Sequence, residues 1–377
     1  MKKATIFLSL AALLASCGSG TSSDPNPGET ITDMIGREVV VKPGTYKKVV
    51  CIGAGALRLY TYIGDVDLLA GVEDIDNESL NDRPKMFDGV ARPYVLAHGE
   101  KFKTLPSCGV GGPNAQAAEA EKILSCKPDI VISEYEDVDK ENALQAQLGV
   151  PVITLKCGNA GLVNENAVKS YTLLGKIFGK ETRAKELNDF VAAQTKALND
   201  KTKDIPEADR VNAYVCGLGN WGTTNQLMTA QNYDIFNTVH INNVVKDLPK
   251  DGIQGITEEK FTSLAPSMDM MVFDAAAVKN IRGKGIDFSA CAAFSAGEVY
   301  LQMAYNAYYI NLETALINAW FTAKSAYPSL FTDIDVEAKA NEITEKFNGK
   351  ALYSAMKAKP QSFGGYQKIA NPTEFFK

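Results

Sequence analysis

The chain has 377 residues, of which 45% are hydrophobic and 22% are charged, and this composition excludes a disordered, collagen-like or coiled-coil protein. Its 45 acidic residues outnumber its 39 lysines and arginines, which gives a net charge of −6, and no dense basic run follows Lys3. A nucleic-acid partner is therefore not expected. The length predicts two domains, each large enough to bury a core.

The amino terminus has the parts of a bacterial secretory signal. Residues 1–3 are cationic, and residues 4–15 form an apolar run that is too short to span a bilayer core of about 30 Å. Small residues then precede Cys17, as in a lipobox. We predict a signal peptide over residues 1–16, lipidation of Cys17 and a flexible tether over residues 17–30. The alternative is an ordinary signal peptide with an incidental cysteine.

These features predict a protein that a lipid holds at the extracytoplasmic face of the cell membrane, with no transmembrane helix. Six other cysteines remain, and none of them forms a Cys-x-x-Cys pair. Export permits disulfides without requiring them, and several of these thiols lie in or beside strand-like runs. We therefore favour packing in the core for Cys51, Cys108, Cys126, Cys157, Cys216 and Cys291.

From residue 31 onward, short β-branched runs alternate with longer amphipathic ones, which predicts parallel βαβ units. Helices are predicted over residues 115–126 and 140–148, and a helical pattern over 166–178 and 180–203 is interrupted only at Gly179. The strands are predicted at residues 48–52, 129–132, 150–155, 212–216, 269–273 and 298–301.

The expected fold class is α/β, with two Rossmann-like lobes of mainly parallel sheets joined by one long α-helix. We assign residues 31–160 to the first lobe, 161–205 to the linking helices and 206–377 to the second lobe. One pattern occurs in both lobes: Glu121 precedes Pro128 by seven residues, and Glu259 precedes Pro266 by seven. Each segment predicts a helix that ends at a proline before a strand begins.

Together these segments resemble the substrate-binding lipoproteins of ABC importers for iron–siderophore, haem and cobalamin complexes. The resemblance covers residues 31–350, and residues 121–132, with the pattern Glu-x-Ile-x-x-x-x-Pro-Asp, are its most specific part. The other matching segments are an opening hairpin at 31–39, strands at 48–52 and 68–72, and residues 149–152.

The resemblance implies a monomeric binder that delivers its ligand to a permease dimer and the ATPase of that dimer. It also implies that one surface glutamate of each lobe docks onto permease arginines, and by position these are Glu121 and Glu259. The alternative is that both are solvated carboxylates at helix starts.

Signals of catalysis are weak in this sequence. Residues 217–222 satisfy Gly-x-Gly-x-x-Gly, but no convincing helix follows them at once. There is no Gly-x-Ser-x-Gly, and His98 and His240 are the only histidines. We therefore expect no enzyme and no resident cofactor, and a surface-anchored enzyme is the less favoured alternative. Two histidines are also few for an importer of free zinc or manganese.

A ligand cleft is expected in the loops that follow strands, where aromatic rings and guanidinium groups suit a bulky metal chelate. Residues 81–113 are interpreted as a long functional loop. A siderophore, haem or another iron chelate is favoured, while a corrinoid or an oxyanion such as molybdate or tungstate remains open. The candidate ligand-binding residues are Arg58, Arg92, Tyr94, Tyr135, Trp221, Arg282, Tyr305 and Tyr308. Three tyrosines at 305, 308 and 309 have helical spacing, so packing against the lobe is the alternative for them.

Overall fold

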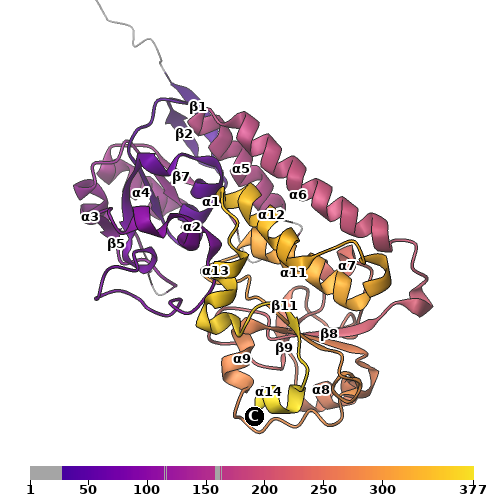
Figure 1. Cartoon of the computed structure of the whole chain (residues 1–377). Coiled ribbons are helices and arrows are strands. Elements are labelled where there is room, and N and C mark those ends of the chain that lie inside the picture. The colour runs from indigo at the N-terminus through magenta and orange to yellow at the C-terminus, as the bar shows by residue number, and fades with distance from the viewer. Residues whose placement is uncertain (1–27, 114, 116, 158–161, 163) are drawn as a thin grey trace, which may run out of the picture.

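The computed structural model describes residues 28–113, 115, 117–157, 162 and 164–377 and contains two α/β lobes (Figure 1). Cys17 and the predicted signal peptide lie outside the described residues. A short antiparallel hairpin, β1 (Glu29–Thr32) with β2 (Glu38–Val41), precedes the first lobe. A buried ion pair of 2.8 Å between Arg37 and Asp33 closes its turn. The predicted opening hairpin is therefore confirmed.

The first lobe is built on five parallel strands in the order β5-β4-β3-β6-β7. All four residues of the central strand β3 are buried, as expected for a parallel sheet that is covered on both faces. The strands are β3 (Val49–Ile52), β4 (Leu69–Glu73), β5 (Ser107–Gly109), β6 (Ile130–Ser133) and β7 (Val152–Thr154). The helices are α1 (Ala56–Ile63), η1 (Val66–Leu68), η2 (Asp74–Asp76), α2 (Pro93–Phe102), α3 (Ala120–Ser125) and α4 (Val138–Leu148).

The second lobe has a five-stranded sheet in the order β10-β8-β12-β13-β14, in which only β14 is antiparallel, and a separate antiparallel pair β9–β11. The strands are β8 (Asn212–Cys216), β9 (Met228–Ala230), β10 (Asn242–Asn243), β11 (Ile253–Gly255), β12 (Met270–Asp274), β13 (Val299–Gln302) and β14 (Gln367–Lys368). Its shorter helices are η3 (Glu207–Asp209), α7 (Asp234–Thr238), α8 (Glu258–Leu264), η4 (Ala265–Ser267), α9 (Ala275–Ile281), α10 (Ala292–Ala296), η5 (Pro328–Leu330), η6 (Pro360–Ser362) and α14 (Pro372–Phe376).

The two lobes repeat one junction. In the first, α3 leads to β6, which pairs with β3; in the second, α8 and η4 lead to β12, which pairs with β8. The backbone N–H of Asp129 donates to Lys48 over 2.9 Å, and that of Asp269 donates to Asn212 over 2.9 Å. The correspondence seen in the sequence is therefore structural.

A single helix, α6 (Glu181–Thr202), runs between the lobes along one side of the molecule (Figure 1). Its 22 residues span roughly 33 Å at 1.5 Å per residue. The preceding helix α5 (Glu165–Phe178) lies beside it instead of extending it, because Gly179 adopts a left-handed φ of 63° and turns the chain. Gly175 permits this close packing, since an added Cβ would lie 2.8 Å from that of Ala184.

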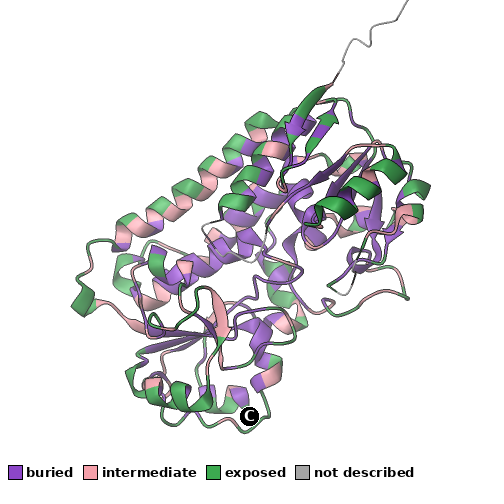
Figure 2. Ribbon diagram, turned by 180° about the vertical axis from the view of Figure 1, so that it is seen from behind, coloured by how far each residue is buried: buried purple, intermediate pink, exposed green. Residues whose placement is uncertain are grey.

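The chain returns to the first lobe near its end. The buried helix α11 (Leu312–Ala326) lies at the centre, and α12 (Val336–Asn348) and α13 (Tyr353–Ala358) pack against α2 (Figures 1 and 2). Glu313 joins three helices, because its carboxylate accepts hydrogen bonds from Tyr62 of α1 and Asn348 of α12. These contacts fix the second lobe against the first on the side of α6.

One local prediction was wrong. Residues 81–113 contain α2 and β5, and helix α2 starts where Pro93 takes the first position after Arg92. The tyrosines at 305–309 lie in a loop, and Tyr308 and Tyr309 have left-handed φ values of 61° and 62° that a helix excludes. Among the described residues, all six cysteines are buried and unpaired, and no helix is long and apolar enough to cross a membrane.

Candidate ligand-binding cleft

A cavity of about 480 Å³ lies between the lobes at the carboxyl ends of their parallel strands. Loops after β3, β4, β5 and β6 form one side, and loops after β8 and β13 form the other. This is the position at which open α/β sheets bind ligands. The lining residues are Ala54, Met86, Phe87, Gly112, Pro113, Ala115, Glu134, Tyr135, Asn220, Trp221, Thr223, Asn306, Tyr308 and Tyr309.

A second cavity, of about 640 Å³, adjoins the first on the side of the second lobe. Asn220, Thr223 and Asn306 line both cavities, so the two are neighbours that share part of their walls. The second is more polar, with Tyr305 and Asp251 in its wall. Together they offer room for a ligand of the size of a drug or larger.

Tyr308 joins the lobes at the edge of the first cavity. Its hydroxyl donates to Glu73 over 2.8 Å and accepts from the backbone N–H of Gly112 over 2.9 Å. Glu73 also accepts from the N–H of Gly53 over 3.0 Å, and burial raises its pKa to about 7. The strained backbone of Tyr308 is therefore held by contacts in the opposite lobe.

Arg58 of α1 supports the same loop from below. Its fully buried guanidinium donates to the backbone carbonyls of Ala307, over 3.2 Å, and of Tyr308 and Ile310. These carbonyls lie in a loop, where no helix or sheet supplies a hydrogen-bond donor, so the guanidinium donates to them instead. Arg58 therefore positions the loop and does not line either cavity.

Arg92 and Tyr94 are buried under the cavity as well. Arg92 pairs with Asp76, and the Tyr94 hydroxyl donates to the same carboxylate over 2.8 Å. Arg92 also lies 5.4 Å from the ring of Phe87, which is a wall of the cavity. Both residues hold η2 and the wall in place rather than facing the hollow.

The eight residues proposed from the sequence thus divide into groups. Tyr135, Trp221 and Tyr308 line the first cavity, and Tyr305 lines the adjoining one. Arg58, Arg92, Tyr94 and Arg282 line neither. Arg282 lies at the end of α9, where it donates to Phe375 over 2.7 Å and stacks on that ring at 4.3 Å.

Glu134 is a lining residue that sequence reasoning did not single out. It follows β6 directly, and only 5% of its surface is exposed. Among the described residues, neither carboxylate oxygen finds a hydrogen-bond partner, although Cys157 N–H and the Arg58 guanidinium lie nearby. Burial raises the pKa of Glu134 to about 8. Its place immediately after a buried strand is the signal that could have identified it.

Asn306 has the complementary property on the opposite wall. It is 6% exposed, and its side-chain N–H₂ lacks a hydrogen-bond partner within the described part of the chain. None of the lining residues of the first cavity is a lysine or arginine. The first cavity therefore combines aromatic walls with two buried polar side chains that lack partners among the described residues, and with no lysine or arginine.

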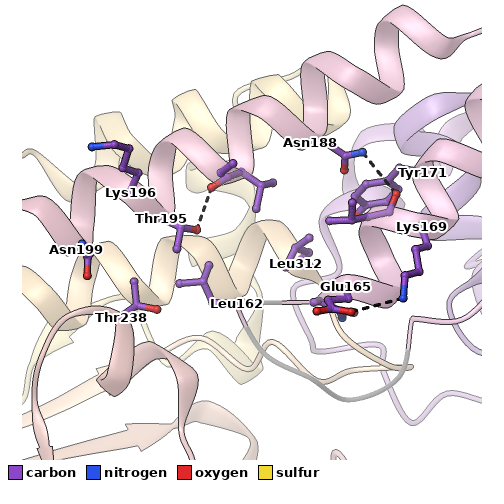
Figure 3. Close-up of a pocket in the computed structure, with 14 residues that line it drawn as sticks. Leu162, Glu165, Lys169, Tyr171, Asn188, Thr195, Lys196, Asn199, Thr238 and Leu312 are labelled. Atoms are coloured by element: carbon purple, nitrogen blue, oxygen red, sulfur yellow. Dashed lines mark hydrogen bonds and ion pairs between the residues drawn. The ribbon is translucent and has the colours of Figure 1, made fainter.

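Another hollow, of about 610 Å³, lies between α5 and α6 and the second lobe (Figure 3). Val168, Val191 and Leu312 make its wall largely apolar, and exposed lysines stand at its edge. It lies beside the linking helices and away from the strand ends. Its position associates it with the packing of α6 and not with the cleft.

Glu121 and Glu259 are both exposed, in the first turns of α3 and α8. Helix α3 precedes β6, which pairs with β3, and helix α8 precedes β12, which pairs with β8. The two carboxylates therefore occupy equivalent positions of the two lobes.

Comparison with known families and structures follows this geometry. The family model described as periplasmic binding protein matches residues 49–279, which is more than half of the chain. The chain belongs to the periplasmic binding protein family. Members of this family are solute-binding proteins and not enzymes, which agrees with the expectation from the sequence. A search of curated protein sequences finds no match.

Solved structures share the fold of this periplasmic binding protein at low sequence identity. A periplasmic solute-binding protein of Veillonella parvula is 17% identical with a TM-score of 0.67, over 92% of this chain and 99% of its own. The molybdate-binding protein MolA of Haemophilus influenzae is 17% identical with a TM-score of 0.64, over 86% and 98%. The TroA-like protein FepB of Veillonella parvula is 21% identical with a TM-score of 0.60, over 84% and 95%.

Proposed function

We propose that this periplasmic binding protein captures a metal chelate, an iron complex foremost, and delivers it to an ABC importer. The ligand class is a siderophore, haem-like or corrinoid complex of low negative charge. The observation that carries this proposal is the cavity between the lobes, with its aromatic walls and no cationic lining residue among those that the structure describes.

The size and walls of the cleft favour a chelate over a bare ion. Two adjoining cavities of about 480 and 640 Å³ far exceed the volume of a hydrated metal ion or a tetrahedral oxyanion. Phe87, Tyr135, Trp221 and Tyr309 supply flat apolar area at low entropy cost. Among the described residues, no cluster of His, Cys, Asp and Glu could hold a metal ion by itself.

The charges of the cleft argue against an oxyanion, although a neighbour of the same fold binds molybdate. An oxyanion needs cations or free backbone N–H groups. Here Arg58 and Arg92 are occupied by carbonyls and by Asp76, and the N–H of Gly112 donates to Tyr308.

Delivery follows from the family and from the positions of two carboxylates. Neighbours of this fold include a structure of an Fe³⁺-hydroxamate ABC transport system. We propose that exposed Glu121 and Glu259, one on each lobe, dock on a permease dimer driven by its ATPase, because charges at a fixed separation set the register of a partner. We further propose that lipid on Cys17 holds the protein at the membrane.

A thermal-shift panel tests the ligand class. It contains ferrichrome, ferrioxamine B, haem, cyanocobalamin, molybdate and tungstate. A ligand at 100 times its Kd stabilises the native state by about 2.7 kcal/mol, so a true ligand is visible. We expect at least one chelate to raise the melting temperature and the oxyanions to leave it unchanged. Stabilisation by molybdate or tungstate alone would refute the proposal.

A further inference from the structure

Two buried hydrogen-bonding groups that line the first cavity lack partners among the described residues, and they come from opposite lobes. The carboxylate of Glu134 follows β6 in the first lobe, and the side-chain amide of Asn306 follows β13 in the second. Both residues line the first cavity and are more than nine-tenths buried. Buried polar groups in native proteins are almost always hydrogen-bonded, so two exceptions in one cavity need an explanation.

The surroundings of Glu134 place its carboxylate beside both lobes. A β-carbon added to Gly55 would lie 3.8 Å from Oε1 of Glu134 and 3.7 Å from Cβ of Tyr309. Gly55 belongs to the loop after β3, and Tyr309 comes from the second lobe and lines the cavity. This oxygen therefore lies where the loop after β3 meets the second lobe.

The Cys157 N–H and the charges of Arg58 and Lys156 favour the ionised form of Glu134, but burial outweighs them and raises its pKa. Both Nη atoms of Arg58 donate to the carbonyls of residues 307, 308 and 310, and its Nε lacks a partner among the described residues. Glu136, two residues later, pairs instead with Lys156 over 2.9 Å outside the cavity. Among the described residues that line the cavity, the carboxyl group of Glu134 and the side-chain N–H₂ of Asn306 are thus the buried groups without a hydrogen-bond partner.

We propose that these two groups recognise an amide of the ligand, whose N–H donates to Glu134 and whose C=O accepts from Asn306. This inference rests on the proposed function and narrows it to amide-bearing metal chelates, such as peptidic hydroxamates or corrinoids. The N–H and C=O of a trans secondary amide point in opposite directions, which matches one complementary group on each wall. A chelate without an amide leaves both groups buried and unpaired, which costs affinity.

The recognition also requires both lobes at once. Glu134 belongs to the first lobe and Asn306 to the second, so an amide between them bridges the two sides of the cleft. One amide can make both hydrogen bonds only when the two lobes hold Glu134 and Asn306 on either side of it. Substitutions at the two positions are therefore expected to be non-additive for an amide-bearing ligand.

The experiment compares the full-length protein with four variants by isothermal titration. The probes are ferrichrome and cyanocobalamin, which carry amides, and haem, which carries none. Glu134→Met and Asn306→Leu remove the acceptor and the donor, Glu134→Gln keeps one acceptor oxygen, and Glu136→Gln is the matched control. Urea unfolding of each variant checks that the native state is intact.

We expect an amide-bearing probe to bind the wild type more tightly than haem does. Glu134→Met and Asn306→Leu should each weaken that probe about tenfold or more, while Glu134→Gln stays within about threefold and Glu136→Gln leaves the affinity unchanged. Haem affinity should not fall in any variant.

Several results would overturn the inference. If haem bound more tightly than both amide-bearing probes, the proposed function would stand, but the inference that the site recognises an amide would be rejected. Equal losses in Glu134→Gln and Glu134→Met would show that the carboxylate charge matters and that the ligand group is a cation. Unchanged affinity in Glu134→Met and Asn306→Leu would also reject the site. Failure of all three chelates to bind would instead reject the proposed function itself.

Discussion

Tyr308 donates a hydrogen bond of 2.8 Å to Glu73, although 235 positions separate the two residues in the chain. Glu73 ends β4 in the first lobe, and Tyr308 lies in the loop after β13 in the second. The bond crosses the cleft beside the cavity and holds the left-handed backbone of Tyr308 in place. The cleft floor is therefore built jointly by both lobes before any ligand arrives.

Removing the hydroxyl of Tyr308 should destabilise the floor of the cleft. We expect Tyr308→Phe to lower the free energy of unfolding by about 1–3 kcal/mol, because Glu73 and the N–H of Gly112 both lose a buried partner. Urea unfolding measures the loss. Tyr309→Phe is the control, since Tyr309 is partly exposed and should change stability by less than about 0.5 kcal/mol. Equal effects of the two substitutions would contradict the role given to Tyr308.

Arg58 should be a structural residue and not a ligand contact. Arg58→Met removes the guanidinium donor from three buried carbonyls, so we expect a loss of about 3 kcal/mol or more in the free energy of unfolding. Arg282→Met removes a surface contact with Phe375 and should cost about 1 kcal/mol or less. Chemical denaturation of both variants makes the comparison. If Arg58→Met kept normal stability but lost ligand affinity, Arg58 would have to be assigned as a ligand contact.

Stability should fall as the pH rises from 6.5 to 8.5. Burial raises the pKa of Glu73, Glu141 and Asp274 to about 7 and that of Glu134 to about 8. In the unfolded chain these carboxyls are already ionised above pH 5, so the folded state binds more protons and its stabilisation is lost as they dissociate. Below pH 6.5 His98 acts in the opposite direction, because burial lowers its pKa to about 4.

Urea unfolding at pH 6.5, 7.5 and 8.5 checks this dependence. The Glu134→Gln variant should lose less stability over the interval than the wild type, by the order of 1–2 kcal/mol, because it lacks the group that titrates last. A wild type that gains stability toward pH 8.5 would show that these carboxyls are ionised in the native state at neutral pH.

Docking should depend on Glu121 and Glu259 together. In cells that take up a radiolabelled chelate, Glu121→Ala combined with Glu259→Ala should abolish uptake and leave ligand affinity unchanged, because both carboxylates are exposed and lie outside the cleft. The matched control is Glu165→Ala with Glu186→Ala on the linking helices. Weakened ligand affinity in the docking variant would contradict the assignment.

Anchoring should depend on Cys17. We expect Cys17→Ala to move the protein from the membrane fraction to the soluble fraction, because the predicted lipid has no other attachment point. Fractionation and immunoblotting measure the distribution. Ser16→Ala, which keeps a small residue before the cysteine, should leave the protein in the membrane fraction. Full membrane retention of Cys17→Ala would reject the lipid anchor.

The sequence alone predicted the class of fold, because its signals are local. Strand runs such as residues 212–216 and the break at Gly179 depend on neighbouring residues, and the strands β3, β6, β8, β12 and β13 lie within one or two residues of the predicted positions. Spacing likewise identified Glu121 and Glu259 as equivalent. Local patterns also misled, since helical spacing at Tyr305 and Tyr308 gave no warning of the left-handed backbone.

Only the tertiary structure decided which side chains face the cleft. Arg58 and Arg92 have the chemistry of ligand contacts, yet carbonyls from residues 307–310 and the carboxylate of Asp76 occupy them. Glu134 and Asn306 became notable because each lines the same cavity, is buried, and finds no hydrogen-bond partner in the part of the chain that the structure describes. Whether a polar group is satisfied depends on residues far away in the chain, and a linear pattern does not contain that information.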